Sequence, residues 1–249
     1  MTMSIALQLY SLRDSLAHNF EKGIREVARI GYAGVETSNF VGITPEAARK
    51  LFDDLGLAVA AVHADYPLIG DHQDEVLETT DALGCNRIIL GGIQPEHTKT
   101  DEQVRRACDF DNEMQAIARA HGLSLGLHNH WWEFAQTREG HLVFDLMQKY
   151  LSPDIFFEVD TYWAKTAGQD PAALVSQLGR RAPLLHLKDG PAKQKQPQVA
   201  VGDGVMDIPV ILKAGANHAE WGIVELDECA TDMMEAVRKS YVYLEKINR

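Results

Sequence analysis

Short apolar runs alternate with longer helical patterns along the whole chain. Eight runs have the composition of buried strands, and they cover residues 5–9, 34–36, 57–63, 87–90, 123–130, 155–160, 184–188 and 223–226. Between the first two, Phe20, Ile24, Val27 and Ile30 recur every three or four residues, which predicts a helix with one apolar face. Eight strand–helix units in 249 residues favour an α/β fold of the (β/α)8 TIM barrel type.

Local signals set the boundaries of several predicted helices. They are Thr44 before Pro45, Thr100 with Gln103 in a capping box, Asp170 before Pro171, and Gly31 at a helix end. Residues 10–13 lack the glycine-rich turn of an open dinucleotide-binding sheet. Residues 189–207 are rich in Gln, Pro, Gly and Lys, which predicts a loop over the barrel mouth. Because no linker divides the chain, we expect a single barrel domain over residues 1–249.

The composition limits the kinds of molecule that the protein is expected to bind. The chain has 24 Lys and Arg against 36 Asp and Glu, and its net charge of −12 argues against binding to nucleic acid. No run approaches the roughly 18 apolar residues of a membrane helix. The first residues lack a secretory signal, so a cytoplasmic enzyme is expected. Cys85, Cys108 and Cys229 are predicted to be free thiols, because three distant cysteines fit neither a disulfide framework nor a cysteine-rich zinc site.

Polar residues gather where the predicted strands end. They are Glu36, His63, His128, His130, Asp160, His186, Lys188 and Glu225. In a TIM barrel these ends surround the active site. Side chains alternate along a strand, so Gly126, His128 and His130 are expected to face the interior, opposite Leu125 and Leu127.

Three of these residues make a plausible metal-ligand set. Asp160, His186 and Glu225, with one more carboxylate or imidazole, offer the oxygen and nitrogen ligands that Mn²⁺, Mg²⁺, Co²⁺ and Zn²⁺ accept. Carboxylates buried together without a cation would be costly or would take up protons. As isolated residues, the same side chains could serve as helix caps, salt-bridge partners or core histidines. Their shared position at strand ends favours the metal site.

Seven segments together resemble the sugar isomerase/epimerase superfamily with the xylose isomerase-like barrel. They are QLYSLRD at 8–14, IGYAGVE at 30–36, LHNHWWEF at 127–134, FEVDTYWAKTAGQDP at 157–171, LLHLKDG at 184–190, VGDGVMDIP at 201–209 and IVELDE at 223–228. The superfamily includes ketose 3-epimerases, hydroxypyruvate isomerases, inosose dehydratases and repair nucleases. The resemblance implies one divalent metal, with Mn²⁺ as first choice, and four ligands at the ends of strands five to eight.

The fourth ligand is where this chain departs from its relatives. Many of them carry Glu where this sequence has His128. The nearest carboxylate is Glu133, in the predicted loop just beyond. Glu133 is therefore the expected ligand beside Asp160, His186 and Glu225, with His128 as the alternative. A histidine there would put a symmetric mechanism with two glutamates in doubt.

The resemblance also implies a reaction. The expected activity is isomerisation or epimerisation of a small sugar or keto-sugar through a metal-stabilised enediolate, and the alternative is a lyase that performs β-elimination on a keto-sugar, inosose or 3-keto-glycoside. Glu225, His128 or Glu133 would move the proton, and Lys188 would neutralise oxyanion charge. Glu36, His63, His130 and Trp163 are expected to bind substrate, although Trp163, like Trp131 and Trp132, is equally natural in a core.

Two other classes of protein remain open at this point. A repair nuclease would need more metal ligands and a basic surface, which the net charge of −12 argues against. A non-catalytic sugar-binding or protein-binding barrel would not need ligands at the strand ends. The sequence leaves open whether the chain forms a homo-oligomer.

Overall fold

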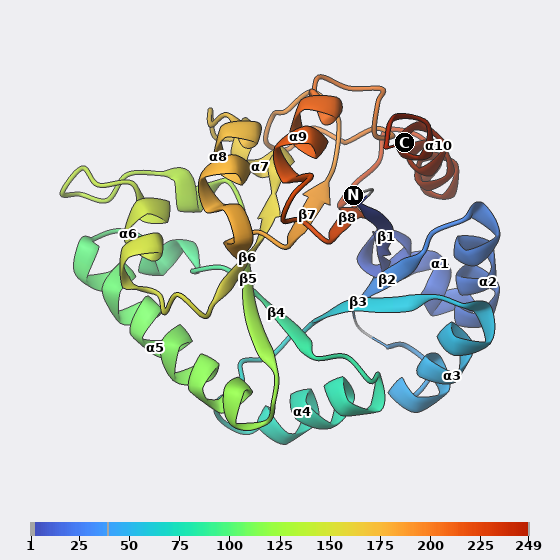
Figure 1. Cartoon of the computed structure of the whole chain (residues 1–249), viewed down its shortest axis with the longest axis horizontal. Helices are drawn as coiled ribbons and strands as arrows, with labels where there is room; N and C mark the ends of the chain where they lie inside the picture. Colours follow the sequence, from blue (N-terminus) through green and yellow to red (C-terminus); the bar gives the residue numbers. More distant parts are fainter. Residues whose placement is uncertain (1–2, 39, 249) are drawn as a thin grey trace.

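Eight parallel strands close into a barrel (Figure 1). The computed structural model describes residues 3–38 and 40–248, and within these the strands pair in sequence order, with the eighth against the first. The strands are β1 Ser4–Gln8, β2 Gly34–Thr37, β3 Ala58–His63, β4 Arg87–Gly91, β5 Ser124–His128, β6 Phe156–Asp160, β7 Leu184–Leu187 and β8 Trp221–Val224. The TIM barrel prediction is confirmed, and the open doubly wound sheet is ruled out.

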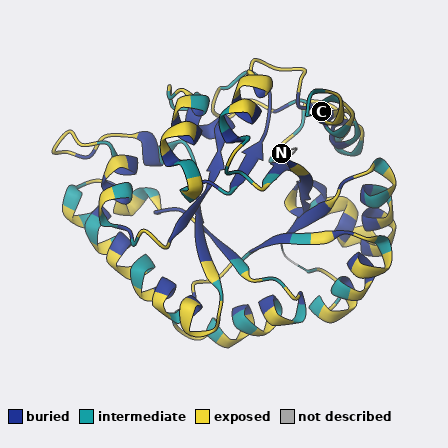
Figure 2. Ribbon diagram, in the orientation of Figure 1, coloured by how far each residue is buried: buried dark blue, intermediate teal, exposed yellow. Residues whose placement is uncertain are grey.

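Helices surround the barrel and turn their buried faces to the strands (Figure 2). They are α1 Arg13–His18, α2 Phe20–Ile30, α3 Pro45–Leu55, α4 Gln73–Ala82, α5 Asp101–Ala120, α6 Val143–Tyr150, α7 Thr161–Thr166, α8 Pro171–Leu178, α9 Ile208–Gly215 and α10 Met233–Ile247. Short 3-10 turns lie at Leu9–Leu12, Pro95–His97, Trp132–Phe134 and Gly179–Arg181. Among the described residues, no helix has both the length and the apolar character needed to span a membrane.

The predicted helix boundaries are confirmed by their capping bonds. The side chain of Thr44 accepts a hydrogen bond from the Ala47 amide at 3.3 Å, and Asp170 accepts from the amides at the start of α8. Gly31 ends α2 with a φ of 117°, a conformation that costs glycine little. The predicted free thiols are also confirmed, with Cys108 buried and the other two half-buried.

Three features of the fold differ from the predictions. Strand β5 ends at His128, two residues early, because the chain turns where the His130 amide bonds to the Glu133 carboxylate. Helices α1, α7 and α9 were not predicted, and β8 covers Trp221–Val224 where residues 223–226 were expected. Helix α9 is a short apolar stretch that follows the irregular segment 189–207. That segment is held by buried Asp189, which accepts hydrogen bonds from three of its backbone amides.

The barrel interior has an apolar floor beneath a polar layer. The floor is built from Ala6, Ala60, Ala61, Ile89, Phe156, Leu184 and Ile223. The next inward-facing residues along these strands are polar and buried. Glu158 lies two residues beyond Phe156, and His186 lies two residues beyond Leu184. The floor supports this polar layer at the carboxyl ends of the strands.

Substituting Gly126 with Ala tests the packing of that floor. An added Cβ would lie 2.3 Å from the Phe156 ring and 2.8 Å from Ile89, so the floor would have to shift. We expect a loss of about 1–3 kcal/mol in the free energy of unfolding, measured by urea denaturation. Gly91→Ala is the control, because nothing lies within 4 Å of its added Cβ. Equal stability of the two variants would contradict this packing.

Candidate metal centre and active site

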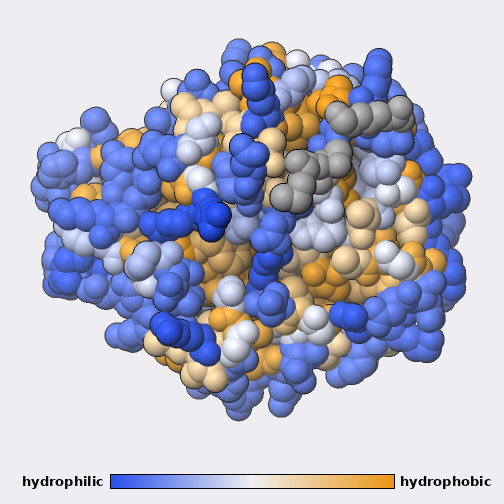
Figure 3. Space-filling model, in the orientation of Figure 1, coloured by the Kyte–Doolittle hydropathy of each residue, from blue (hydrophilic) through white to orange (hydrophobic). Residues whose placement is uncertain are grey.

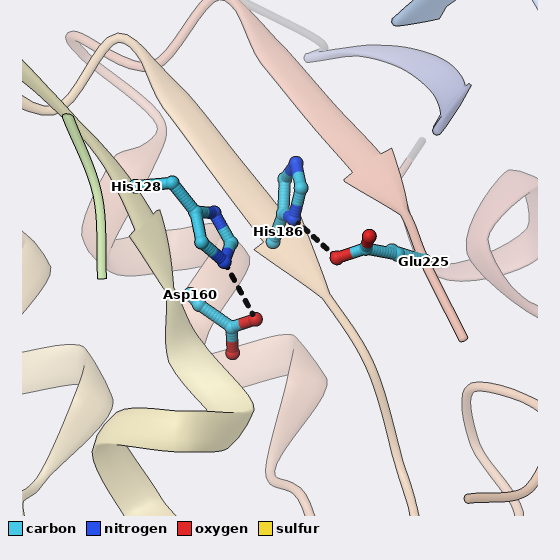
Figure 4. Close-up of side chains that lie close together, drawn as sticks. All are labelled: His128, Asp160, His186 and Glu225. Atoms are coloured by element: carbon cyan, nitrogen blue, oxygen red, sulfur yellow. Dashed lines mark hydrogen bonds and ion pairs between the residues drawn. The ribbon is translucent and has the colours of Figure 1, made fainter. Parts of the chain in front are cut away.

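Four side chains converge at the ends of β5 to β8. His128, Asp160, His186 and Glu225 are buried, and each offers a ligand atom within 4.8 Å of the others (Figure 4). Parallel pairing places Asp160 beside His186 in register, and Glu225 follows β8 directly. We call these four residues the ligand quartet.

Asp160 is fixed by its place between a strand and a helix. Its Oδ1 accepts a hydrogen bond from the Trp163 amide at 2.7 Å and so caps α7. Its backbone is clamped by the Asn129 side chain, which bonds both its amide and its carbonyl. The other oxygen, Oδ2, therefore points into the quartet, 3.6 Å from His128 Nε2. Burial raises the pKa of Asp160, although the charges of Lys188 and His186 oppose this.

Carboxylates contact both ring nitrogens of His186. Its Nδ1 lies 2.8 Å from Glu225 Oε2, and its Nε2 lies 2.9 Å from Glu36 Oε2 and 3.1 Å from Glu158 Oε2. Burial would lower the pKa of His186, but the carboxylates of Glu158, Glu36 and Glu225 raise it well above its usual value. A metal-binding histidine commonly has its second nitrogen held by a carboxylate in this way.

His128 carries no charge at neutral pH. Burial, and after it the positive charge of His186, hold the pKa of His128 well below its usual range. Its Nδ1 lies 3.1 Å from Glu158 Oε2, which leaves Nε2 facing Asp160. A neutral imidazole is the form that binds metals, so His128 is ready to bind, whereas His186 would release a proton when a metal binds.

Lys188 brings a positive charge into the same cluster. Its ammonium is 2.6 Å from Glu225 Oε2, 3.0 Å from Asp160 Oδ2 and 2.8 Å from Asp227 Oδ2. Burial would lower the pKa of Lys188, but these three carboxylates raise it well above its usual value. In turn, although burial opposes it, Lys188 and His186 hold the pKa of Glu225 well below its usual range.

A second group of three ligand-type residues lies beneath the quartet. It consists of Glu36, Glu158 and His186. Glu36 is bonded by Gln8 and by His63, whose Nδ1 is 3.2 Å away. Burial and the charge of Glu36 raise the pKa of Glu158, so the pair retains one proton between its carboxyl groups. Glu36 Oε2 and Glu158 Oε2 both contact His186 Nε2, so this group holds His186 from below, whereas Glu158 Oε1 is buried and accepts no hydrogen bond from the described residues.

The quartet has the chemistry of a divalent-metal site. Two carboxylates and two imidazoles form an oxygen and nitrogen donor set suited to Mn²⁺, Zn²⁺ and similar ions. Asp160 Oδ2 is buried and accepts no hydrogen bond from the described residues, although the Lys188 ammonium is 3.0 Å away. A buried carboxylate oxygen left in this state fits a metal ligand.

Glu133 is not among the residues that the structure brings together. Its carboxylate accepts the His130 amide at 2.9 Å and lies against Gly92, and neither candidate ligand group contains it. The candidate ligand group contains His128 instead, the alternative considered from the sequence, and we propose His128 as the fourth ligand. Glu133 lies in the 3-10 turn after β5, and the His130 amide holds its Oε2 there, while its Oε1 is buried and accepts no hydrogen bond from the described residues.

The predicted substrate-binding residues lie at different depths. His63 and His130 line a cavity of about 900 Å³, and their rings lie 5.7 Å and 5.1 Å from the His128 ring. Trp163 is buried, 5.5 Å from the Lys188 ammonium. Glu36 is fully buried beneath the quartet, so its contacts in this structure are with protein groups. Figure 3 shows apolar residues on both sides of a band of hydrophilic residues in the middle of one face, with mostly hydrophilic residues around the edge.

Sequence reasoning missed three buried or half-buried polar residues that support the site. Glu158 shares a strand face with Asp160, and the alternation of residues 156–160 could have revealed it. Gln8 ends β1 in register with Glu36, at a strand end like the others. Asp227 lies in the loop after β8 and gave no such signal.

Comparison with known protein families gives a direct match over most of the chain. A sequence model of the family described as "Xylose isomerase-like TIM barrel" matches residues 24–226. The chain belongs to this family. Its members catalyse sugar epimerisation, isomerisation and dehydration, which agrees with the resemblance seen in the sequence motifs.

Individual relatives span nearly the whole chain. A curated relative, the inosose dehydratase of Erwinia tasmaniensis, is 22% identical over 251 residues, covering 85% of this chain and 83% of its own. A sugar phosphate isomerase/epimerase of Parabacteroides distasonis superimposes with a TM-score of 0.84 at 25% identity, covering 98% of both chains. The IolI protein, solved with a bound zinc atom, superimposes with a TM-score of 0.73 at 14% identity and covers 97% of this chain and 98% of its own.

Proposed function

We propose that the chain is a divalent-metal-dependent isomerase or epimerase of a small sugar or keto-sugar, and that it moves a proton at the carbon next to the carbonyl. The observation that carries the proposal is the buried ligand quartet at the carboxyl ends of β5 to β8. Active sites of TIM barrels lie at this end. Family membership and the isomerase/epimerase from Parabacteroides distasonis support the same class of reaction.

The metal would be held by His128, Asp160, His186 and Glu225. Mn²⁺ is our first choice, and Mg²⁺, Co²⁺ and Zn²⁺ also suit the donor set, which agrees with the zinc atom in the IolI protein. When bound, a divalent ion supplies Lewis acidity that polarises a carbonyl oxygen and acidifies the neighbouring C–H bond.

Glu225 is the base in this proposal. Its contacts with His186 and Lys188 are both made by Oε2, which leaves Oε1 to take the substrate proton. Its pKa lies well below the usual value, so it is a carboxylate at neutral pH. Lys188 lies beside the same carboxylate and can stabilise negative charge that develops on a substrate oxygen.

Substrate would approach from the cavity side. His63 and His130 line the cavity, and in this proposal they would bind sugar hydroxyl groups. His130 stacks on Trp132 with 4.0 Å between ring centroids, which fixes its orientation. Trp163 could offer its ring face to the C–H side of a sugar.

We further expect one domain over residues 1–249, a cytoplasmic location and no nucleic-acid partner, as the composition indicates.

A lyase is the second candidate, because the curated relative that spans 85% of this chain is an inosose dehydratase. Removal of the same proton by Glu225 would then lead to breakage of the bond to a β-substituent. That group leaves with the bonding electrons and takes up a proton, and the product is an unsaturated ketone. Both reactions share the first proton transfer and differ in the second step.

Proton exchange in deuterated water tests the proposal. Purified protein with added Mn²⁺ is incubated with a panel of keto-sugars and inososes, and the products are read by NMR. Deuterium next to the carbonyl together with a rearranged sugar supports the isomerase or epimerase, whereas an unsaturated product supports the lyase. We expect chelation to abolish exchange and added Mn²⁺ to restore it. Exchange that persists after the metal is removed would contradict the proposal.

A further inference from the structure

The ammonium of Lys188 lies on the same oxygen atoms that face the ligand quartet. It contacts Asp160 Oδ2 at 3.0 Å and Glu225 Oε2 at 2.6 Å. Those two atoms also face the histidine ligands, since His128 Nε2 is 3.6 Å from the first and His186 Nδ1 is 2.8 Å from the second. A lysine and a divalent ion would therefore share two carboxylate oxygens.

Sharing these atoms makes the two cations competitors. Lys188 is buried to 1% exposure, so water screens its charge poorly. A second cation on the same oxygens would be repelled by the ammonium, and it would replace part of the stabilisation that the ammonium now gives to the buried carboxylates. Lys188 thus supplies the positive charge that balances the buried carboxylates when no metal is bound.

Asp227 is a third carboxylate that the ammonium already contacts. Its Oδ2 is 2.8 Å from Lys188 Nζ, and it belongs to neither candidate ligand group. Gln198 fixes this carboxylate by donating to Oδ2 at 2.9 Å and accepting from the Asp227 amide at 2.7 Å. Arg13 bonds the Asp227 carbonyl at 2.8 Å. Lys188 can therefore keep Asp227 as a carboxylate partner when Asp160 and Glu225 bind a metal ion.

We propose that Lys188 is an internal cation that keeps the quartet assembled without metal, and that metal binding takes Asp160 and Glu225 from its ammonium and leaves the ammonium on Asp227 alone. Asp227 then sets the metal affinity by holding the displaced charge. This inference rests on the metal site of the proposed function.

A double-mutant cycle measures this competition. Metal-free protein is titrated with Mn²⁺ alone by calorimetry, and Kd is compared for wild type, Lys188→Met, Asp227→Asn and the double variant. We expect Lys188→Met to bind about 10-fold more tightly and Asp227→Asn about 10-fold more weakly, within the range by which contacting charges couple. In the double variant, the Asp227→Asn effect should disappear, because there is no ammonium left to hold. Lys213→Met, an exposed site on α9, is the control.

Thermal unfolding gives a second readout. Metal-free Lys188→Met should have a lower Tm than wild type, and Mn²⁺ should raise its Tm by more. Should Lys188→Met fail to fold without metal, Asp227→Asn alone still tests the competition. Unchanged or weaker binding in Lys188→Met, or unchanged binding in Asp227→Asn, overturns the inference while the metal site stands. A wild-type protein that binds no Mn²⁺ overturns both.

Discussion

Glu225→Gln is expected to slow substrate proton exchange by roughly 10²–10⁴-fold, the usual contribution of a general base. The amide has nearly the same shape as the carboxylate but cannot accept the proton. The change also removes one anionic ligand from the quartet, so exchange is measured at saturating Mn²⁺ to separate loss of the base from loss of the metal. Deuterium incorporation into the keto-sugar identified by the substrate panel is the measurement.

Glu228→Gln is the matched control for this experiment. Glu228 lies three residues further along the same loop and is exposed. The same loss of charge at this position should leave exchange unchanged. If Glu225→Gln exchanges protons at the wild-type rate, Glu225 is not the base, and another residue near the cavity must remove the proton.

His128→Ala is expected to weaken Mn²⁺ binding by more than about 100-fold, since loss of an outer-shell partner alone typically costs 10–100-fold. The structure places His128 Nε2 in the quartet as a neutral donor, and alanine provides no replacement ligand. Metal affinity by calorimetry is the readout, with circular dichroism to confirm the fold.

Glu133→Gln distinguishes the two candidates for the fourth ligand. Its carboxylate bonds the His130 amide and lies outside the quartet, so the amide should leave Mn²⁺ affinity within a few-fold of wild type. The opposite pattern, with Glu133→Gln losing metal and His128→Ala retaining it, would return the fourth position to Glu133.

Most of the site residues that could be predicted from the sequence were found from the alternation of side chains along the strands. Polar residues at the predicted ends of strands five to eight identified His128, Asp160, His186, Lys188 and Glu225, and the closed barrel brings all five together. This works because a parallel barrel places every strand end at one mouth and because period-two alternation fixes which side chains face inward. His128, Asp160 and His186 lie within strands β5 to β7, and Glu225 is the first residue after β8, so strand register sets these positions more than the path of a long loop does.

The residues that strand periodicity could not place lie in the loops that follow the strands. Whether Glu133 reaches the quartet depends on the turn after β5, which is set by the bond from the His130 amide and by packing against Gly92. Periodicity cannot predict such a turn. Asp227 likewise comes from a loop, and its contact with Lys188 joins residues 39 apart in the sequence. Glu158 was within reach of the same alternation argument that found Asp160.

Anomalous X-ray diffraction from crystals grown with Mn²⁺ and recorded at the manganese absorption edge tests the central claim most directly. The account predicts one strong peak among His128, Asp160, His186 and Glu225, about 2.0–2.3 Å from one atom of each. It also predicts that the Lys188 ammonium lies against Asp227 alone. No peak at saturating manganese, or a peak held by other residues, would contradict it.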